Sequence, residues 1–116
     1  MKKITIIALV VFIFGSIFIM SCSKEAETPA PVKVTYNKDI KAIFTANCTP
    51  CHLAGGTNPN KWDDYTQAKA KITAILDRVQ RQPGTTGFMP RNGTMQLPQA
   101  TIDKLKQWVS DGLLEN

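Results

Sequence analysis

The segment Cys48-Thr49-Pro50-Cys51-His52 carries the most distinctive chemistry in the sequence. Two thiols stand with two residues between them, and an imidazole follows directly. This spacing lets both sulfurs reach the two vinyl groups along one edge of a porphyrin, while the imidazole turns under the ring to bind iron. The pattern is typical of covalent haem attachment, and it is most specific in a protein that is exported from the cytoplasm.

The N-terminus has the features of a secretory signal. Lys2 and Lys3 precede an apolar run from Ile4 to Met20. The run ends at Ile19-Met20-Ser21-Cys22, which resembles a bacterial lipobox, where a small residue precedes a cysteine that becomes lipidated. We therefore expect residues 1–21 to be a lipoprotein signal peptide and Cys22 to carry the lipid. The alternative is that the run stays uncleaved as a helical membrane anchor.

Composition divides the remaining chain into a tether and one domain. Residues 22–33 are mostly polar and contain prolines, as expected of a flexible tether. The chain has three cysteines, so Cys22 for the lipid and the pair Cys48 and Cys51 leave no thiol for a disulfide. A domain as small as residues 34–116 therefore needs another source of stability.

Helical periodicity predicts about three helices in residues 34–116, and no segment shows sustained strand-like alternation. We expect the first helix to run from Tyr36, with Asn37 as its cap. The second helix should begin near Asp63 or Asp64 and end at Gln82-Pro83-Gly84, and the third should run from about Pro98 to Gly112. The expected buried faces are Ile40, Ile43 and Phe44; Tyr65, Ala68, Ile72, Ile75, Leu76 and Val79; and Ile102, Leu105, Trp108 and Val109. The first helix leads directly into the cysteine motif.

Two long irregular segments, 53–60 and 85–96, separate these helices. Loops of this length are unusual in so small a domain unless they wrap around something. A haem is a large apolar disc that supplies the missing core. The sequence therefore predicts an all-α fold with long loops around one covalently bound haem c per chain.

Cys48 and Cys51 are the expected thioether attachments, and His52 is the expected proximal iron ligand. A histidine in this role normally donates its other N–H to a backbone carbonyl, and the carbonyl just before or at Pro59 is the candidate here. Three residues could donate hydrogen bonds to the haem propionates: Trp62, Tyr65 and Arg91. Packing or surface roles are equally open to them.

The sixth iron ligand can be narrowed by elimination. His52 is the only histidine, so two histidine ligands from one molecule are impossible. A methionine thioether is favoured, and Met89 is the first choice because Pro90 stiffens its loop. Met95 is the alternative, and each methionine could instead fill a gap in the core.

Residues Val34 to Leu114 resemble a class I c-type cytochrome, particularly the short bacterial monohaem domains. The resemblance rests on the first helix leading to the cysteine motif, on Met89-Pro90, and on the closing pattern Leu105-x-x-Trp108-Val109-x-x-Gly112. It implies that the first and last helices cross, with Trp108 near Phe44, and that Met89 is the distal ligand. It departs from the family in lacking a clear Gly-Pro-x-Leu loop after His52.

With both axial positions filled by protein, the expected function is one-electron transfer without catalysis. The expected partners are an oxidase, a reductase or another cytochrome, together with a membrane that the lipid anchor binds. The expected location is the periplasmic side of a bacterial membrane or the cell surface. The formal charge of +5 falls to +3 without Lys2 and Lys3, and the remaining cations are scattered, so nucleic-acid binding is not expected.

Three other functions remain open from the sequence alone. A haem enzyme or gas sensor would have a methionine ligand that a small molecule displaces. A thiol oxidoreductase would use Cys48 and Cys51, but it normally sits on alternating strands and helices, which are not predicted here. A zinc site would lack a fourth ligand at a convincing spacing.

Overall fold

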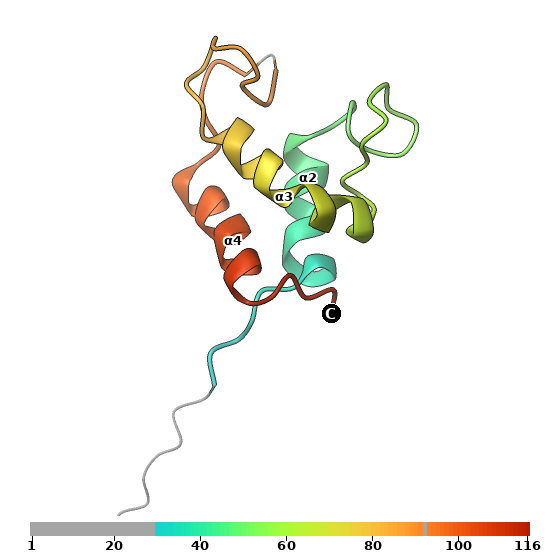
Figure 1. The fold of residues 1–116 in the computed structure, drawn as a ribbon, viewed down its shortest axis with the longest axis vertical. Coiled ribbons are helices and arrows are strands. Elements are labelled where there is room, and N and C mark those ends of the chain that lie inside the picture. The colour runs from blue at the N-terminus through green and yellow to red at the C-terminus, as the bar shows by residue number, and fades with distance from the viewer. Residues whose placement is uncertain (1–29, 92) are drawn as a thin grey trace, which may run out of the picture. The chain divides into compact units, whose positions relative to one another are not determined.

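A computed structural model describes residues 30–91 and 93–116, and residues Pro31–Asn116 form one compact unit. The order of elements is a π-helical turn η1 (Tyr36–Ile40), then α2 (Lys41–Asn47), α3 (Tyr65–Val79) and α4 (Gln99–Ser110) (Figure 1). Because η1 runs directly into α2, the described residues contain the three expected helical segments. The predicted all-α fold is confirmed.

The first helical segment begins at Tyr36, as expected, but its cap is not the residue that the sequence predicts. Thr35 precedes the first turn, and its N–H donates to Asp39 Oδ2 at 3.0 Å. The N–H groups of Tyr36 and Asn37 donate to the carbonyls of Leu114 and Glu115, at 2.9 and 3.0 Å. The prediction of Asn37 as the cap is therefore wrong, because the C-terminal segment satisfies these donors from a distance in sequence.

The second helix begins and packs as its sequence predicts. Asp64 precedes α3 and accepts a hydrogen bond from the N–H of Gln67 at 2.8 Å, which satisfies one donor of the first turn. The helix ends at Val79, before the breaker at Pro83. Its apolar face contains buried Ala68, Ile72, Ile75 and Val79, with Tyr65 and Leu76 partly buried beside them.

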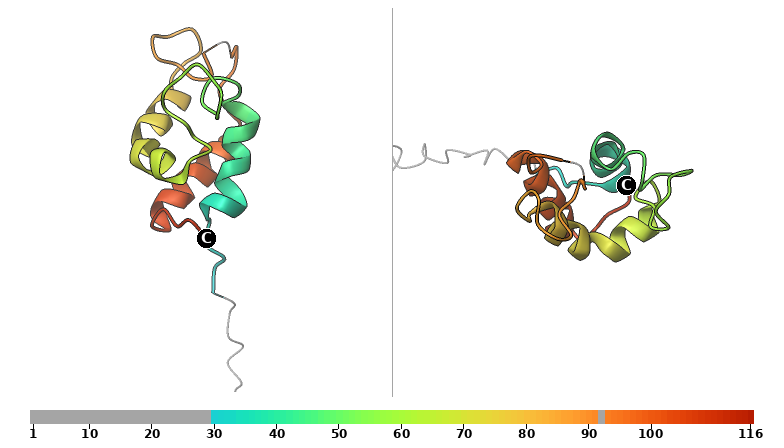
Figure 2. Two further views of the ribbon diagram at one scale, coloured as in Figure 1. Left: turned by 90° about the vertical axis from the view of Figure 1, so that its right-hand side faces the viewer. Right: turned by 90° about the horizontal axis from the view of Figure 1, so that it is seen from above.

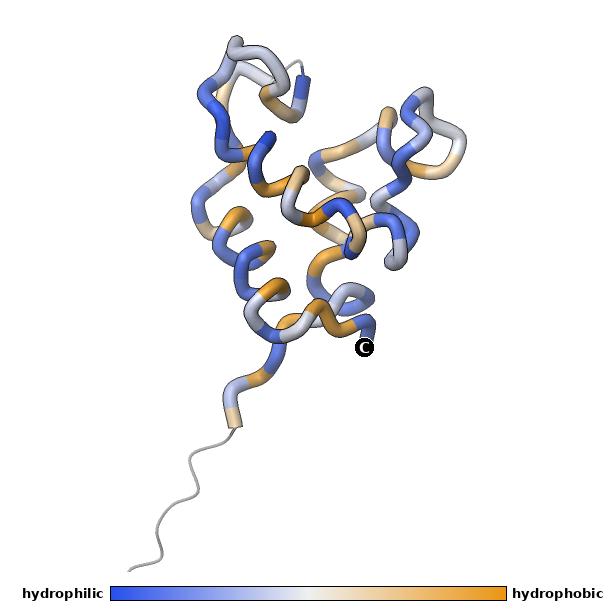
Figure 3. Tube along the Cα trace, viewed as in Figure 1, coloured by the Kyte–Doolittle hydropathy of each residue, from blue (hydrophilic) through white to orange (hydrophobic). Residues whose placement is uncertain are grey.

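The third helix follows Pro98, as expected, and buries Ile102, Leu105 and Trp108. Val109 is 40% exposed, so its predicted burial is wrong. Trp108 fills the inner side of this last turn, where its ring packs against Tyr36 and Tyr65. Apolar residues recur on the side of α4 that faces the other helices (Figure 3).

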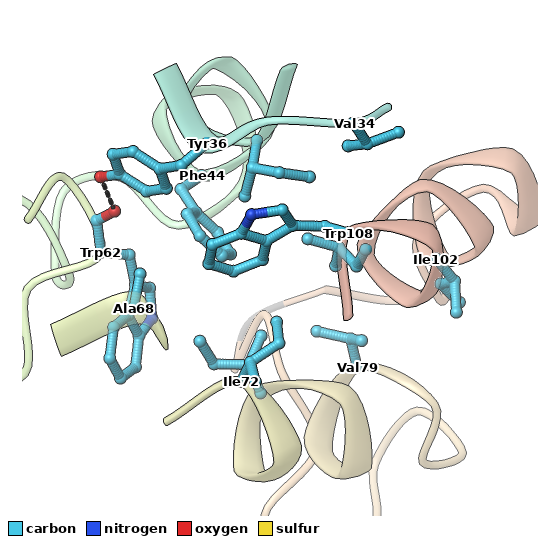
Figure 4. Close-up of a cluster of buried hydrophobic side chains, with 12 residues drawn as sticks. Val34, Tyr36, Phe44, Trp62, Ala68, Ile72, Val79, Ile102 and Trp108 are labelled. Atoms are coloured by element: carbon cyan, nitrogen blue, oxygen red, sulfur yellow. Dashed lines mark hydrogen bonds between the residues drawn. The ribbon is translucent and has the colours of Figure 1, made fainter. Parts of the chain in front are cut away.

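The core joins the first and last helical segments. Trp108 is 0% exposed, and its ring centroid lies 5.8 Å from that of Tyr36. Phe44 belongs to the same buried cluster, although the aromatic ring it pairs with is Trp62, at 6.4 Å (Figure 4). Four residues of α3 belong to the same cluster: Ala68, Ile72, Ile75 and Val79.

The C-terminal residues lie beside the beginning of the domain. Thr35 and Leu114 form an isolated parallel bridge, and Val34 N–H donates to Asp111 Oδ2 at 2.7 Å. The indole N–H of Trp108 donates to the Leu114 carbonyl at 2.8 Å. The two long loops lie at the other end of the unit, away from the C-terminus (Figures 1 and 2).

The expected signal peptide and Cys22 lie outside the described residues. In residues 30–91 and 93–116, no helix combines the length and the apolar character that a membrane crossing requires.

Candidate functional site

A cavity of about 760 Å³ lies between α3 and the loops on either side of it. This volume falls within the usual range for a site that encloses a small molecule or cofactor. Residues of the cysteine motif line it, together with Met89 and the apolar side chains of Ile75, Val79 and Leu97. The structure thus brings the predicted attachment residues and one predicted distal ligand to a single cavity.

The cysteine motif continues directly from α2. The N–H of Cys48 donates to the Phe44 carbonyl at 2.8 Å, and the N–H of His52 donates to the Cys48 carbonyl at 3.0 Å. This turn places Cys48, Cys51 and His52 among the residues that line the cavity. Cys48 is half-buried and Cys51 is exposed.

His52 is held by its ring and by its backbone. Its Nδ1 lies 3.0 Å from the Asn60 carbonyl oxygen, and its ring stacks on Trp62 with centroids 4.8 Å apart. The Trp62 N–H donates to the His52 carbonyl at 2.7 Å. An imidazole whose Nδ1 donates to a carbonyl has Nε2 available for a metal.

The predicted partner of His52 needs a correction, because the carbonyl belongs to Asn60 and not to Pro59 or the residue before it. Asn60 is held in position by hydrogen bonds within its loop, and the sequence pattern does not reveal them. The backbone N–H and the side-chain amide of Asn60 both donate to Asn58 Oδ1, at 2.9 and 3.1 Å. The N–H of Asn58 in turn donates to the Cys51 carbonyl at 3.1 Å.

Gly56 allows this loop to pass close to the motif. A Cβ atom at Gly56 would lie 2.0 Å from the Pro50 carbonyl oxygen and 2.5 Å from that of Cys51. Only glycine fits such a close approach of two backbone segments. The glycine-rich loop therefore folds back along the motif and supports the His52 side of the cavity.

The two candidate distal methionines lie in different environments. Met89 is partly buried, lines the cavity and packs against the core, and its N–H donates to the Arg78 carbonyl at 3.2 Å. Met95 is 77% exposed and is not among the residues that line the cavity. The arrangement therefore favours Met89 for a ligand that faces His52.

Among the residues that the structure describes, three cationic residues and no acidic residue line the cavity: they are Lys71, Arg78 and Arg91. Of the predicted propionate partners, Arg91 and Trp62 lie at the cavity, whereas Tyr65 donates its hydroxyl to the Leu113 carbonyl at 2.8 Å. Sequence reasoning missed Lys71 and Arg78. Their spacing to buried Ile75 along α3 is the signal that could have placed them at the edge of its apolar face.

The donor set fits a covalent haem better than the other uses of two thiols and an imidazole. Burial raises the pKa of Cys48 to about 11, whereas a redox-active thiol usually has a lowered pKa. Within the described part of the chain, no three His, Cys, Asp or Glu side chains are grouped to hold a metal ion by themselves. An apolar cavity beside two thiols and an imidazole suits a flat, apolar cofactor that supplies its own iron.

Comparison with known proteins agrees with this geometry. A family model described as cytochrome c oxidase, cbb3-type, subunit III matches residues 36–109, which is more than half of the chain. Neither the curated proteins nor the solved structures gave a match. The chain therefore belongs to this cytochrome c family, and it contains a class I c-type cytochrome domain whose cofactor is covalently bound haem c.

Proposed function

We propose that this protein is a one-electron carrier whose haem is attached through Cys48 and Cys51 and bound at iron by His52 and Met89. The observation that carries the proposal is that one cavity is lined by all four of these side chains. The bound haem would supply the ferrous and ferric states between which the electron is exchanged. The protein residues hold the cofactor and fix its two axial ligands.

The environment of His52 supports its role as the proximal ligand. The Asn60 carbonyl orients the ring through Nδ1, and Trp62 restricts its rotation by stacking. A carbonyl partner of this kind also makes the imidazole a stronger ligand. On the opposite side, a thioether from Met89 would raise the reduction potential relative to a second imidazole.

The cationic rim supports binding of an anionic cofactor. Three cationic residues line the cavity: Lys71, Arg78 and Arg91. A haem carries two negatively charged carboxylates. Opposite charges in a partly enclosed site attract more strongly than they do in water. These three side chains therefore balance the charge of the bound group.

Both axial positions would be filled by protein, which leaves no open iron site for a substrate. We therefore favour an electron carrier over a haem enzyme or a gas sensor with a displaceable methionine. Electrons would pass to or from an oxidase, a reductase or another cytochrome, in a respiratory chain. The match to an oxidase-subunit family supports this kind of partner.

The N-terminal sequence supports a membrane-tethered arrangement of this carrier. In this proposal residues 1–21 are the signal peptide, Cys22 carries lipid, residues 22–33 are the tether and residues 34–116 are the haem domain. The domain would then lie at the periplasmic side of a bacterial membrane or at the cell surface. Mass spectrometry of the purified protein tests it, since an N-terminus at Met1 with unmodified Cys22 contradicts it.

Replacing Met89 with alanine tests the axial ligation. We expect Met89→Ala to abolish the far-red methionine-to-iron charge-transfer band of the ferric protein, because the thioether is removed from the cavity. Met95→Ala is the matched control and should keep the band, since Met95 is exposed. Loss of the band in Met95→Ala alone would show that the assignment of Met89 is wrong.

A further inference from the structure

The loop that contains Met89 is attached to the C-terminal turn of α3 by several side chains. Gln96 Nε2 donates to the carbonyls of Gln80 and Arg81, at 2.7 and 2.9 Å. These two carbonyls lie just beyond the end of α3, where a helix leaves backbone acceptors without partners. The Gln96 amide therefore joins the returning end of the loop to the end of the helix.

The outgoing end of the same loop is held by two arginines of this turn. Arg81 donates to the Thr86 carbonyl at 2.6 Å and forms an ion pair with Asp77, also at 2.6 Å. Arg78 reaches the Gly87 carbonyl at 3.4 Å. Cations near a helix C-terminus also interact favourably with the helix dipole.

Gly87 has the backbone conformation that this packing requires. Its φ is +82°, and an added Cβ would lie 2.5 Å from Arg81 Nη1 and 3.2 Å from Arg78 Nη1. Two residues later, the N–H of Met89 donates to the Arg78 carbonyl. The loop is thus attached to α3 before Met89 by the two arginines. Toward α4, Gln96 hydrogen-bonds to the end of α3 and the neighbouring Leu97 packs against the core.

We propose that Gln96 is a positioning residue for Met89, and that its two hydrogen bonds limit how often the thioether leaves the iron. The inference rests on the proposed His52 and Met89 ligation. Gln96 itself does not line the cavity, so it acts through the loop and not by touching the cofactor. Loss of its amide frees the returning end of the loop, and Met89 then moves away from iron more easily.

Imidazole binding to the ferric, haem-loaded full-length protein measures this movement. At saturating imidazole, the observed rate equals the rate at which methionine dissociates from iron. We expect Gln96→Ala to raise this limiting rate about tenfold, because two hydrogen bonds are lost. Gln96→Arg should stay within about threefold of the original rate, since an arginine can still donate to carbonyls at a helix end.

Two controls separate the positioning role from a general loss of stability. Gln82→Ala removes an exposed glutamine from the same loop, and it should change the limiting rate by less than about twofold, because Gln82 accepts from Thr85 through its backbone carbonyl, which alanine keeps. Leu105→Ala weakens the core away from the cavity, and it should lower the unfolding free energy without raising this rate.

The outcomes distinguish this inference from the proposed function. If the far-red band is present and Gln96→Ala exchanges ligand no faster than Gln82→Ala, the role of Gln96 is wrong and the ligation stands. If the original protein has no far-red band and its imidazole binding shows no limiting rate, the ligation by Met89 is wrong, and the role of Gln96 is overturned with it.

Discussion

Tyr36 connects the core to the loop that holds His52. Its hydroxyl donates to the Trp62 carbonyl at 2.7 Å (Figure 4). The N–H of the same tryptophan donates to the His52 carbonyl. The Tyr36 side chain is almost completely buried. A residue of the first helical turn therefore supports the loop segment that holds His52.

Burial, and to a smaller extent the nearby carboxylates of Asp63, Asp64 and Glu115, together raise the pKa of Tyr36 to about 12. Between pH 10 and 12 the unfolded chain loses this proton before the folded protein does. The contribution of Tyr36 to the unfolding free energy should therefore be fully present below pH 10 and should be lost as the pH rises from 10 to 12.

The change Tyr36→Phe tests this contribution. At pH 7 it should lower the unfolding free energy by about 1 kcal/mol through loss of one hydrogen bond. In denaturant titrations from pH 7 to 12, the variant should lose less stability than the original protein above pH 10. Parallel curves for the two proteins would contradict the role given to the Tyr36 hydroxyl.

At the scale of the helices, the sequence predicts a helix end correctly where the capping hydrogen bond is made by a residue nearby in the chain. Asp64 precedes α3 and accepts from Gln67, within one turn of the chain, so the sequence reveals the start of that helix. The predicted cap Asn37 is wrong because the N–H groups of Tyr36 and Asn37 pair with Leu114 and Glu115. Such long-range pairing leaves no periodic signal in the neighbouring residues.

Burial along α4 shows the same distinction. Leu105 and Val109 are one helical turn apart, and periodicity gives both the same face, yet Leu105 is 1% exposed and Val109 is 40% exposed. Leu105 belongs to the buried cluster that also contains Trp108, whereas Val109 does not. Periodicity indicates a face, whereas the neighbouring helices determine how much of it is buried.

Alanine substitutions in α4 test this difference. Leu105→Ala should lower the unfolding free energy by about 3 kcal/mol, because it removes buried apolar atoms and leaves a cavity. Val109→Ala in the same helix should cost less than about 1 kcal/mol, because its side chain is already partly in water. Equal losses in chemical denaturation would show that the two positions are buried to a similar extent.

At the scale of the whole domain, the hydrophobic core is small and a cavity lies next to it. The buried cluster lies where η1, α2, α3 and α4 meet, and the two long loops enclose the cavity beyond it. The sequence predicted the all-α fold and the motif because these depend on spacing within the chain. It did not predict the Asn60 contact or the position of Lys71 and Arg78, which depend on how the loops and α3 fold around the site.

Covalent attachment of haem to Cys48 and Cys51 is the central claim, and a haem-stained denaturing gel tests it most directly. Haem staining should stay with the denatured protein, and a pyridine spectrum of the same sample should identify c-type haem. The double change Cys48→Ala and Cys51→Ala should remove the staining. Denatured original protein that retains no haem would contradict the account.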